Sequence, residues 1–171
     1  MAFADELERN NEKYVATFGD KGSLPLPPAK KLAILSCMDA RFDSFAALGL
    51  QEGDAHHIRN AGGRFDPDAV RSLIISQELL GTREVVVVHH TGCGMLTFER
   101  DDLRGLLAER EGLSDEARAL ASRIETHEFG DLEESVREDV AAIRRHPLVL
   151  EGTPVSGWVY EVETGRVRRL V

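Results

Sequence analysis

The stretch that decides the fold is Leu32–Arg41, LAILSCMDAR, whose last five residues carry a cysteine, an aspartate and an arginine. Its apolar run is short and does not alternate, which is typical of a strand buried inside a sheet. A second such run, Val85–Val88, is followed by the loop His89–Met95, HHTGCGM. Catalytic groups of open α/β sheets lie beyond the carboxyl ends of the strands. The two loops are therefore predicted to meet at one edge of a sheet.

Helices and strands are expected to alternate along the rest of the chain. The expected helices are Phe42–Leu50, Pro67–Leu80, Thr97–Arg110 and Asp131–Arg145, and the other strands are His56–Arg59, Glu84–His89, Val155–Val162 and Arg166–Val171. Strands joined by helices favour a mostly parallel sheet, and the Thr164-Gly165 turn favours a closing hairpin. The charged segment Leu113–Leu132 fits two short helices or a mobile excursion. The predicted fold class is α/β: a mostly parallel central β-sheet flanked by helices, with an N-terminal helical arm and an antiparallel C-terminal edge strand.

Helix ends carry their own signals. Asp66 is predicted to cap the helix that begins at Pro67, and Thr97 to cap the next helix. Gly49 or Gly53 is expected to end the helix Phe42–Leu50.

The chain is expected to begin with an amphipathic helix, Ala2–Phe18, followed by the Gly- and Pro-rich segment Gly19–Pro28. A helix on such a tether is either an arm for a partner subunit or a helix packed on its own domain, and the sequence leaves both open. With 171 residues, the chain is predicted to be a single domain, 1–171, in which 1–28 form the arm and linker.

Composition narrows the class of protein. A net charge of −9 disfavours a nucleic-acid partner, which would require a basic face. No apolar run approaches the roughly 18–20 residues that span a bilayer, so no membrane partner is expected. The first residues lack the basic and apolar regions of a secretion signal, which favours a cytoplasmic protein. In that compartment the two cysteines are expected to be thiolates or metal ligands rather than a disulfide.

The residues at the two strand ends fit a zinc site. Zinc favours thiolate and imidazole ligands, and a catalytic site keeps three protein ligands and one open position. Cys37 and the pair His90 and Cys93 would supply three such ligands. Spacing alone does not choose between His89 and His90, which face opposite ways on a strand. Taken alone, Cys37 would be a small buried hydrophobe.

Asp39 and Arg41 are expected to act beside the metal. An arginine close to a carboxylate keeps it ionised and fixes its orientation. Asp39 could then orient a zinc-bound water or hydroxide, or become the fourth metal ligand itself. In isolation, the same two residues would be a structural ion pair. Small residues are expected to leave room for a small substrate in the pocket, whose candidates are Asn60, Ala61, Gly62, Gly63, Gly94 and Met95.

Other chemistries fit less well. A phosphatase loop would place an arginine six residues after the cysteine, where this chain has Asp43, and no CxxC motif supports a redox pair. The remaining histidines are interpreted as ordinary residues, with a proton shuttle as the alternative for His56 or His57; the others are His127 and His146.

With these motifs the chain resembles the β-class carbonic anhydrases. The resemblance rests on Cys37–Arg41, Arg59–Gly62 and His90–Gly94, in matching order and spacing, and it extends from Lys30 to about Leu107. The C-terminal SGWVYEVETGR is similar to the last strand and turn of the family. Two positions depart from family patterns: Pro28 replaces a substrate-holding glutamine of plant-type members, and Ile34 replaces a tryptophan of a bicarbonate control site.

The resemblance implies a lyase, carbonate dehydratase, in which zinc-bound hydroxide reversibly hydrates carbon dioxide to bicarbonate and a proton. It implies Zn²⁺ held by Cys37, His90 and Cys93, with His89 outside the ligand shell, and the Asp39–Arg41 dyad beside it. It also implies a homodimer or a dimer of dimers, with the N-terminal helix embracing the neighbour. A carbonyl sulfide or carbon disulfide hydrolase is the enzymatic alternative on this scaffold, and a non-catalytic zinc-binding sensor module is the other.

Overall fold

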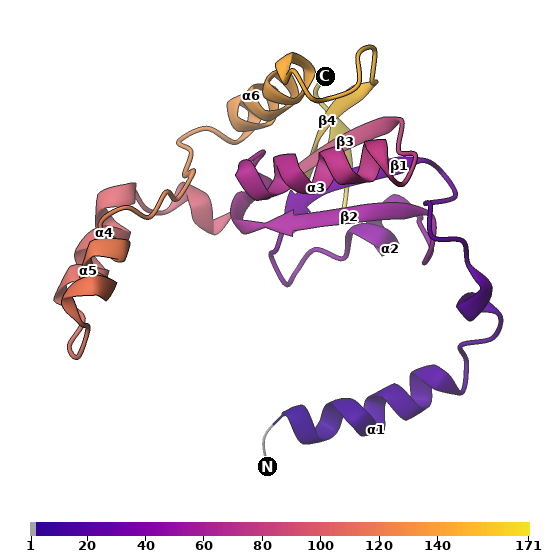
Figure 1. Cartoon of the computed structure of the whole chain (residues 1–171), viewed down its shortest axis with the longest axis horizontal. Coiled ribbons are helices and arrows are strands. Elements are labelled where there is room, and N and C mark those ends of the chain that lie inside the picture. The colour runs from indigo at the N-terminus through magenta and orange to yellow at the C-terminus, as the bar shows by residue number, and fades with distance from the viewer. Residues whose placement is uncertain (1–2) are drawn as a thin grey trace.

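The computed structural model describes residues 3–171 of the chain, as an α/β fold (Figure 1). The helices are α1 (Ala4–Val15), α2 (Ser44–Leu48), α3 (Pro67–Glu78), α4 (Arg100–Glu109), α5 (Asp115–Ala121) and α6 (Leu132–Arg145). The strands are β1 (Leu32–Cys37), β2 (Ala55–Asn60), β3 (Glu84–His90), β4 (Val155–Tyr160) and β5 (Val167–Arg169). Short 3₁₀ turns are η1 (Lys21–Ser23), η2 (Ala61–Gly63) and η3 (Gly94–Leu96).

The strands form one five-stranded sheet in the order β2-β1-β3-β4-β5. The first three pairings in this order are parallel, and β4 pairs with β5 in the antiparallel direction. The predicted fold class is therefore confirmed. Because β1 and β3 are parallel neighbours, with Ser36 opposite Val88, their carboxyl ends deliver Cys37 and His90 to the same edge of the sheet.

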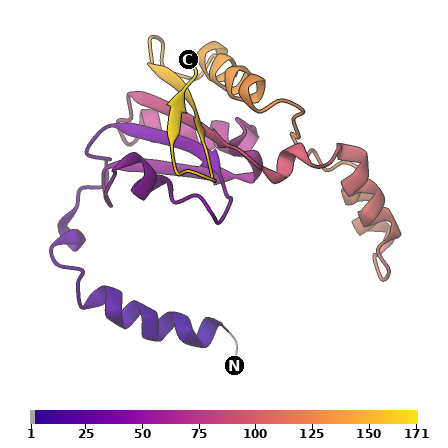
Figure 2. The same ribbon diagram turned by 180° about the vertical axis from the view of Figure 1, so that it is seen from behind.

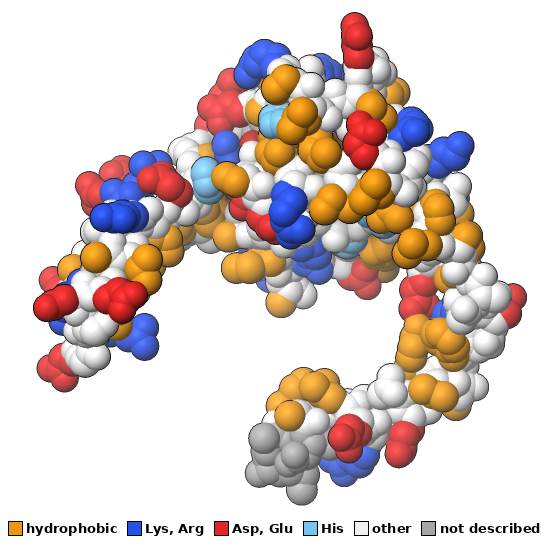
Figure 3. All heavy atoms as spheres, viewed as in Figure 1, with side chains coloured by type: hydrophobic (Ala, Val, Ile, Leu, Met, Phe, Trp, Pro, Cys, Tyr) orange, Lys and Arg blue, Asp and Glu red, His pale blue; other side chains and the backbone are white. Residues whose placement is uncertain are grey.

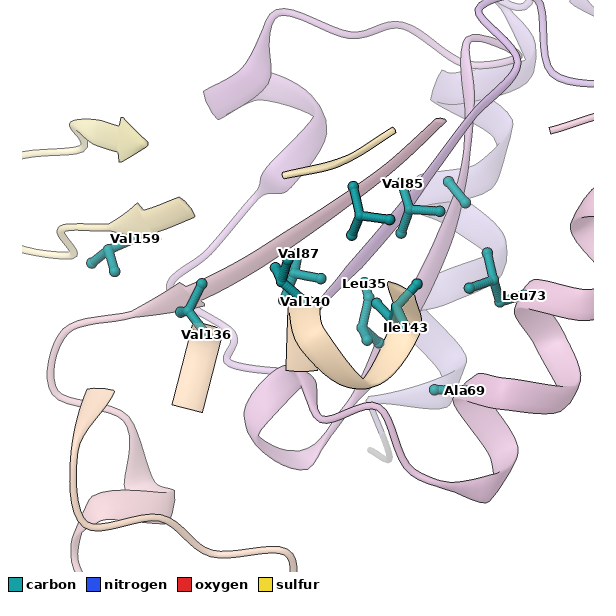
Figure 4. Packing of buried hydrophobic residues seen from close by; sticks show 11 residues of the cluster. Leu35, Ala69, Leu73, Val85, Val87, Val136, Val140, Ile143 and Val159 are labelled. Carbon is teal, nitrogen blue, oxygen red and sulfur yellow. The ribbon is translucent and has the colours of Figure 1, made fainter. Parts of the chain in front are cut away.

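One face of the sheet is covered by α3 and α6. Alternate residues of β1 point to this face, where Leu35 packs with valines of β3 and with apolar side chains of both helices, among them Leu73 of α3 and Val140 and Ile143 of α6 (Figure 4). Among the described residues, the one helix packed on the other face is the short α2, against the cluster of Ile34, Phe42 and Val88 (Figure 1). The sheet is thus thickly covered on one side and thinly on the other.

Two helical segments stand away from this body. The helix α1 projects on the side of the sheet that carries α2, and the pair α4–α5 projects at the other end of the molecule (Figures 1 and 2). The C-terminal end of α1 is tied to the body by Glu52, which accepts a hydrogen bond from Tyr14 and pairs with Lys21. The space-filling view shows how little of either projection touches the body (Figure 3).

Several helices begin or end at other residues than predicted. The predicted helix Ala2–Phe18 is found as α1, which ends at Val15; Ala2 lies outside the described residues. Thr97 is wrong as a helix cap, because α4 begins at Arg100 and the Asp102 carboxylate accepts from the Glu99 N–H at 2.8 Å. Asp66 does cap α3, accepting from the Ala69 N–H at 2.8 Å.

The other changes are at the ends of elements. Gly49, rather than Gly53, ends α2 in the left-handed conformation, with φ +67°. The charged stretch 113–132 forms one helix, α5, followed by an extended return to α6. Among residues 3–171, no helix is long and apolar enough to cross a membrane.

Candidate metal centre

Three potential metal ligands converge at the carboxyl edge of the sheet. Cys37 is the last residue of β1, His90 is the last residue of β3, and Cys93 follows in the loop after β3. One ligand atom from each lies within 4.8 Å of the other two, and all three side chains are buried. The two sulfur atoms are 3.9 Å apart. Two thiols and an imidazole at this spacing match the donor set that zinc prefers.

The hydrogen bonds of His90 leave one ring nitrogen for a metal. Its Nδ1 lies 2.9 Å from the Thr91 carbonyl oxygen, so that this nitrogen carries the proton and donates it. Its Nε2 is buried and has no hydrogen-bond partner among the described residues. A buried nitrogen without a partner is costly unless something binds it. The orphaned Nε2, together with the two sulfurs, fits a zinc ion.

His89 faces the opposite side of the sheet. Its Nδ1 lies 2.8 Å from Ser135 Oγ, and its Nε2 lies 3.2 Å from both the Gly63 carbonyl oxygen and the Asp139 carboxylate. Both ring nitrogens are therefore engaged in the core beneath α6. Of the two adjacent histidines, the structure brings only His90 to the cysteines.

Protons are shared unequally within the cluster. The hydrogen bond from Cys93 is the main reason that the pKa of Cys37 falls to about 4, while the same interaction, together with burial, raises the pKa of Cys93. Burial lowers the pKa of His90, but the neighbouring Cys37 sulfur and the hydrogen bond to the Thr91 carbonyl outweigh it and the net direction is upward. Thiols and imidazoles that hold protons against one another release them when a divalent cation takes their place.

Asp39 and Arg41 form a bidentate ion pair beside the cluster. Arg41 donates from Nε to Oδ1 at 2.9 Å and from Nη2 to Oδ2 at 2.7 Å, and its backbone N–H donates to Oδ1 at 2.8 Å. These hydrogen bonds hold the pKa of Asp39 well below its usual range. Asp39 Oδ2 lies 3.6 Å from His90 Nε2. An ionised carboxylate with a fixed orientation is thus adjacent to the ligand atoms.

The residues predicted to line the pocket lie at the end of β2, which carries Asn60, and in two neighbouring turns, η2 and η3. The turn η2 packs against the end of β1, because a Cβ built on Gly63 would lie 2.8 Å from the Cys37 nitrogen. A Cβ on Gly62 would lie 2.9 Å from Met95 Cγ, so η2 and η3 meet there. Asn60 donates to the Arg64 carbonyl at 2.7 Å, and Gly94 has open space around its Cα. The structure thus brings these predicted residues beside Cys37 and Cys93.

Two further side chains support the site and were not predicted from the sequence. Phe129, from the return segment after α5, packs with Met95 and the two cysteines in one buried cluster. Arg59 donates to three carbonyl oxygens in the segment 37–42, at and after the end of β1: those of Cys37 at 3.0 Å, Asp39 at 2.8 Å and Phe42 at 3.2 Å. The position of Arg59 at the end of a predicted strand was a usable signal, but an aromatic residue in a charged segment was not.

The other histidines lie elsewhere. His57 contacts the hydroxyls of Ser36 and Ser44, each 2.9 Å from Nε2, and burial lowers its pKa to about 4. His56 Nδ1 lies 2.7 Å from Ser76 Oγ. A histidine with a pKa near 4 is uncharged at neutral pH, which argues against His57 as a proton shuttle.

The fold and this site define a class, an α/β enzyme with a Cys-His-Cys metal centre and an adjacent carboxylate–guanidinium pair. The model of the family described as carbonic anhydrase matches residues 32–167. The β-carbonic anhydrase 1 of Mycobacterium tuberculosis is 41% identical over 170 residues, 99% of each chain. A carbon disulfide hydrolase of Acidithiobacillus thiooxidans is 31% identical, over 98% of this chain and 90% of that protein.

Solved structures agree with this relationship. A carbonic anhydrase from Glaciozyma antarctica superposes with a TM-score of 0.94 at 57% identity, over the full length of both chains. A carbonic anhydrase from Streptococcus mutans gives 0.91 at 42% identity, over 100% of this chain and 99% of that one. The chain belongs to the β class of the carbonic anhydrase family, which consists of zinc-dependent lyases. Zinc is accordingly its cofactor, as predicted.

Proposed function

We propose that the protein catalyses the reversible hydration of carbon dioxide to bicarbonate and a proton, with zinc held by Cys37, His90 and Cys93. The observation that carries this proposal is the orphaned, buried His90 Nε2 facing two thiols beside an ionised Asp39. When bound, zinc supplies a Lewis acid that makes water a competent nucleophile near neutral pH.

Asp39 is proposed to orient the attacking water. Because Arg41 donates to both of its oxygens, Asp39 stays ionised and can only accept a hydrogen bond. Oδ2, at 3.6 Å from His90 Nε2, is close enough to the ligand atoms to accept a hydrogen bond from a water there and so direct a lone pair of that water at the substrate. Arg41 therefore acts through Asp39, by holding its charge and its orientation.

The substrate pocket is proposed to lie between η2 and η3. Carbon dioxide is small, linear and apolar, and it requires little more than an apolar wall next to the nucleophile. Met95 and Phe129 provide such a wall against the cysteines, and Gly62 and Gly63 bring backbone close to it without side chains. Ala61 and Gly94 complete the turns.

Carbonyl sulfide and carbon disulfide have the same linear shape and undergo the same attack on carbon. The carbon disulfide hydrolase relative gives this alternative a basis, but its lower identity does not favour it over the carbonic anhydrase relatives.

The decisive experiment is stopped-flow hydration of carbon dioxide by the zinc-loaded protein from about pH 6.5 to 9, with both sulfides assayed on the same sample. Fast hydration that rises with pH supports the proposal. Rapid sulfide release without hydration would move the function to a sulfide hydrolase. Inactivity on all three substrates with zinc bound would leave a sensor module.

The ligand assignment has its own test in zinc content. Cys93→Ser removes one thiolate and is expected to lose most of the bound zinc, measured by mass spectrometry of the metal. Met38→Leu is the control, because Met38 lies between Cys37 and Asp39 but is exposed. Full zinc occupancy in Cys93→Ser would contradict the assignment.

The protein is also proposed to act as a homodimer or dimer of dimers. Phe3, just before α1, is 69% exposed, and Leu7 and Val15 of α1 are 53% and 61% exposed. The helix stands off the body on the thinly covered side of the sheet. A second copy of the chain is the proposed cover for these apolar side chains. A cytoplasmic location is proposed from the use of both cysteines as free thiols.

A further inference from the structure

Glu163 lies in the turn between β4 and β5 and reaches the loop after β3, which joins His90 to Cys93. Its Oε2 accepts a hydrogen bond from Thr91 Oγ1 at 2.7 Å. The same Thr91 oxygen accepts from the Val162 N–H at 3.0 Å, and the Thr91 N–H donates to the Tyr160 carbonyl at 2.9 Å. Three hydrogen bonds therefore fasten the residue after His90 to the chain after β4.

The fastened loop also holds Arg41. Besides its bonds to Asp39, the guanidinium donates from Nη2 to the Gly92 carbonyl at 2.9 Å. Gly92 is in the left-handed region, with φ +59°, and a Cβ there would lie 3.9 Å from Arg41 Nη1. Its backbone conformation therefore aims the carbonyl at Arg41. A shift of Thr91 and Gly92 would move the guanidinium, and Asp39 would move with it.

Charge links the same groups. The Thr91 hydroxyl that donates to Glu163 lowers the pKa of this carboxyl, and the Arg41 guanidinium lowers it further. The pKa of Arg41 is raised, mainly by Asp39 and to a smaller extent by Glu163. Arg41 thus interacts with two carboxylates, Asp39 through direct hydrogen bonds and Glu163 through space.

We propose that Glu163 and Thr91 are positioning residues for the Asp39–Arg41 dyad, acting through the Thr91–Gly92 backbone and the charge of Glu163. The inference rests on the proposed roles of Asp39 and Arg41. Glu163 is exposed, so its hydrogen bond contributes little to the stability of the fold. Its principal effect is the orientation of Arg41 and, through Arg41, of the carboxylate that directs water.

Two substitutions remove the link from either end. Glu163→Ala removes the carboxylate, and Thr91→Val removes the hydroxyl while keeping the shape of the side chain. Each is expected to lower kcat for carbon dioxide hydration about three- to tenfold, with KM and zinc content unchanged, because orientation of the nucleophile matters in the transition state. Thr91→Ser keeps the hydroxyl and is expected to restore kcat to within about twofold of the original. Glu151→Gln, in the exposed turn before β4, is the control and leaves kcat unchanged.

The double variant shows whether the two residues act as a unit. Glu163→Ala combined with Thr91→Val is expected to lower kcat no further than the stronger single variant, because each already breaks the same link. Losses that multiply in the double variant would overturn the proposal, as would single variants with the original kcat.

A measurement without substrate separates this inference from the proposed function. In the zinc-loaded protein, the Nε–H of Arg41 is held by Asp39 and should exchange slowly with water, giving a side-chain NMR signal that Arg41→Lys identifies by its loss. Faster exchange of this signal in Glu163→Ala and Thr91→Val supports the positioning role whichever substrate the enzyme uses. Unchanged exchange in both would overturn it, even if carbon dioxide hydration is confirmed.

Discussion

The Asp39 carboxylate accepts three hydrogen bonds from N–H groups of Arg41. The donors are the backbone nitrogen, Nε and Nη2 of the arginine. Two residues that are two positions apart in the sequence therefore form one ion pair. Such a pair has no net charge, yet it keeps a carboxylate ionised a short distance from the metal ligands. The function proposed for Asp39 depends on this ionised form.

Asp39→Asn tests that dependence. The amide keeps the shape of the side chain but replaces an accepting oxygen by a donating nitrogen, and it loses the charge that holds Arg41. We expect zinc content to remain and kcat/KM for hydration to fall about 100-fold. Unchanged turnover would show that Asp39 does not direct the nucleophile, and loss of zinc would show that it helps to hold the metal instead.

His57 makes a residue-scale prediction about pH. Its pKa is about 4 in the folded protein because of burial, whereas the unfolded chain has an ordinary histidine near 6.5. Between these values the unfolded state binds more protons, so the contribution of His57 to stability is complete above about pH 6.5 and falls as the pH drops toward 4. Arg59 strengthens the shift and Asp43 opposes it.

The measurement compares His57→Gln with the original protein by urea unfolding across this pH range. The variant should lose stability less steeply as the pH falls, and the difference in slope should approach one proton per molecule. Parallel curves would mean that His57 is protonated equally in the folded and unfolded states.

At the scale of elements, η2 packs against the end of β1 that carries Cys37. Gly63 has φ +71°, and a Cβ there would lie 2.8 Å from backbone atoms of both Ser36 and Cys37. No flexible side chain can give way at this contact. Position 63 therefore requires glycine for two reasons: the left-handed backbone conformation and the close contact with the backbone of β1.

Gly63→Ala is expected to reduce the free energy of unfolding by roughly 2–4 kcal/mol and to lower zinc occupancy, because Cys37 must shift. Gly165→Ala is the matched control: its φ is +72° but nothing lies within 4 Å of the added Cβ, so only the conformational cost of roughly 1 kcal/mol applies. Urea unfolding and metal analysis of both variants check this. Equal effects would mean that the contact with Cys37 is unimportant.

The elements also show what sequence can predict here. The strand ends that carry Cys37 and His90 were predictable, because apolar runs and the residues that follow them are local features. The hydrogen bond between Thr91 and Glu163 was not predictable, because these residues are 72 positions apart and are brought together by the pairing of β3 with β4. Phe129 was missed for the same reason, since its position depends on the return from α5. The cap of α4 was misassigned because Thr97 ends η3, where its hydroxyl donates to the Gly94 carbonyl, and α4 begins three residues later.

At the scale of the whole molecule, the thinly covered face of the sheet and the projecting α1 lie on the same side (Figures 1 and 2). The proposal that a second copy covers α1 predicts that Leu7→Glu with Val15→Glu weakens self-association, because two charges would be buried in the contact. Lys13→Glu is the control: it changes the net charge by the same amount on the polar side of α1.

Light scattering after size-exclusion chromatography measures the outcome. The double variant should shift toward the mass of one chain, 18.9 kDa, while Lys13→Glu keeps the mass of the original protein. If the double variant keeps that mass as well, α1 packs on its own chain. The extent of a single domain over 1–171 likewise stays a prediction from sequence.

The distance between the two cysteine sulfurs also determines how readily the metal-free protein is oxidised in air. At 3.9 Å apart they are already neighbours, and a disulfide would require them to close to about 2.05 Å. The Cys37 thiolate next to the Cys93 thiol is the arrangement that oxidants attack first. Zinc therefore guards the sulfurs from oxidation while they hold it, and protein stripped of metal in air should need a reductant as well as zinc to recover.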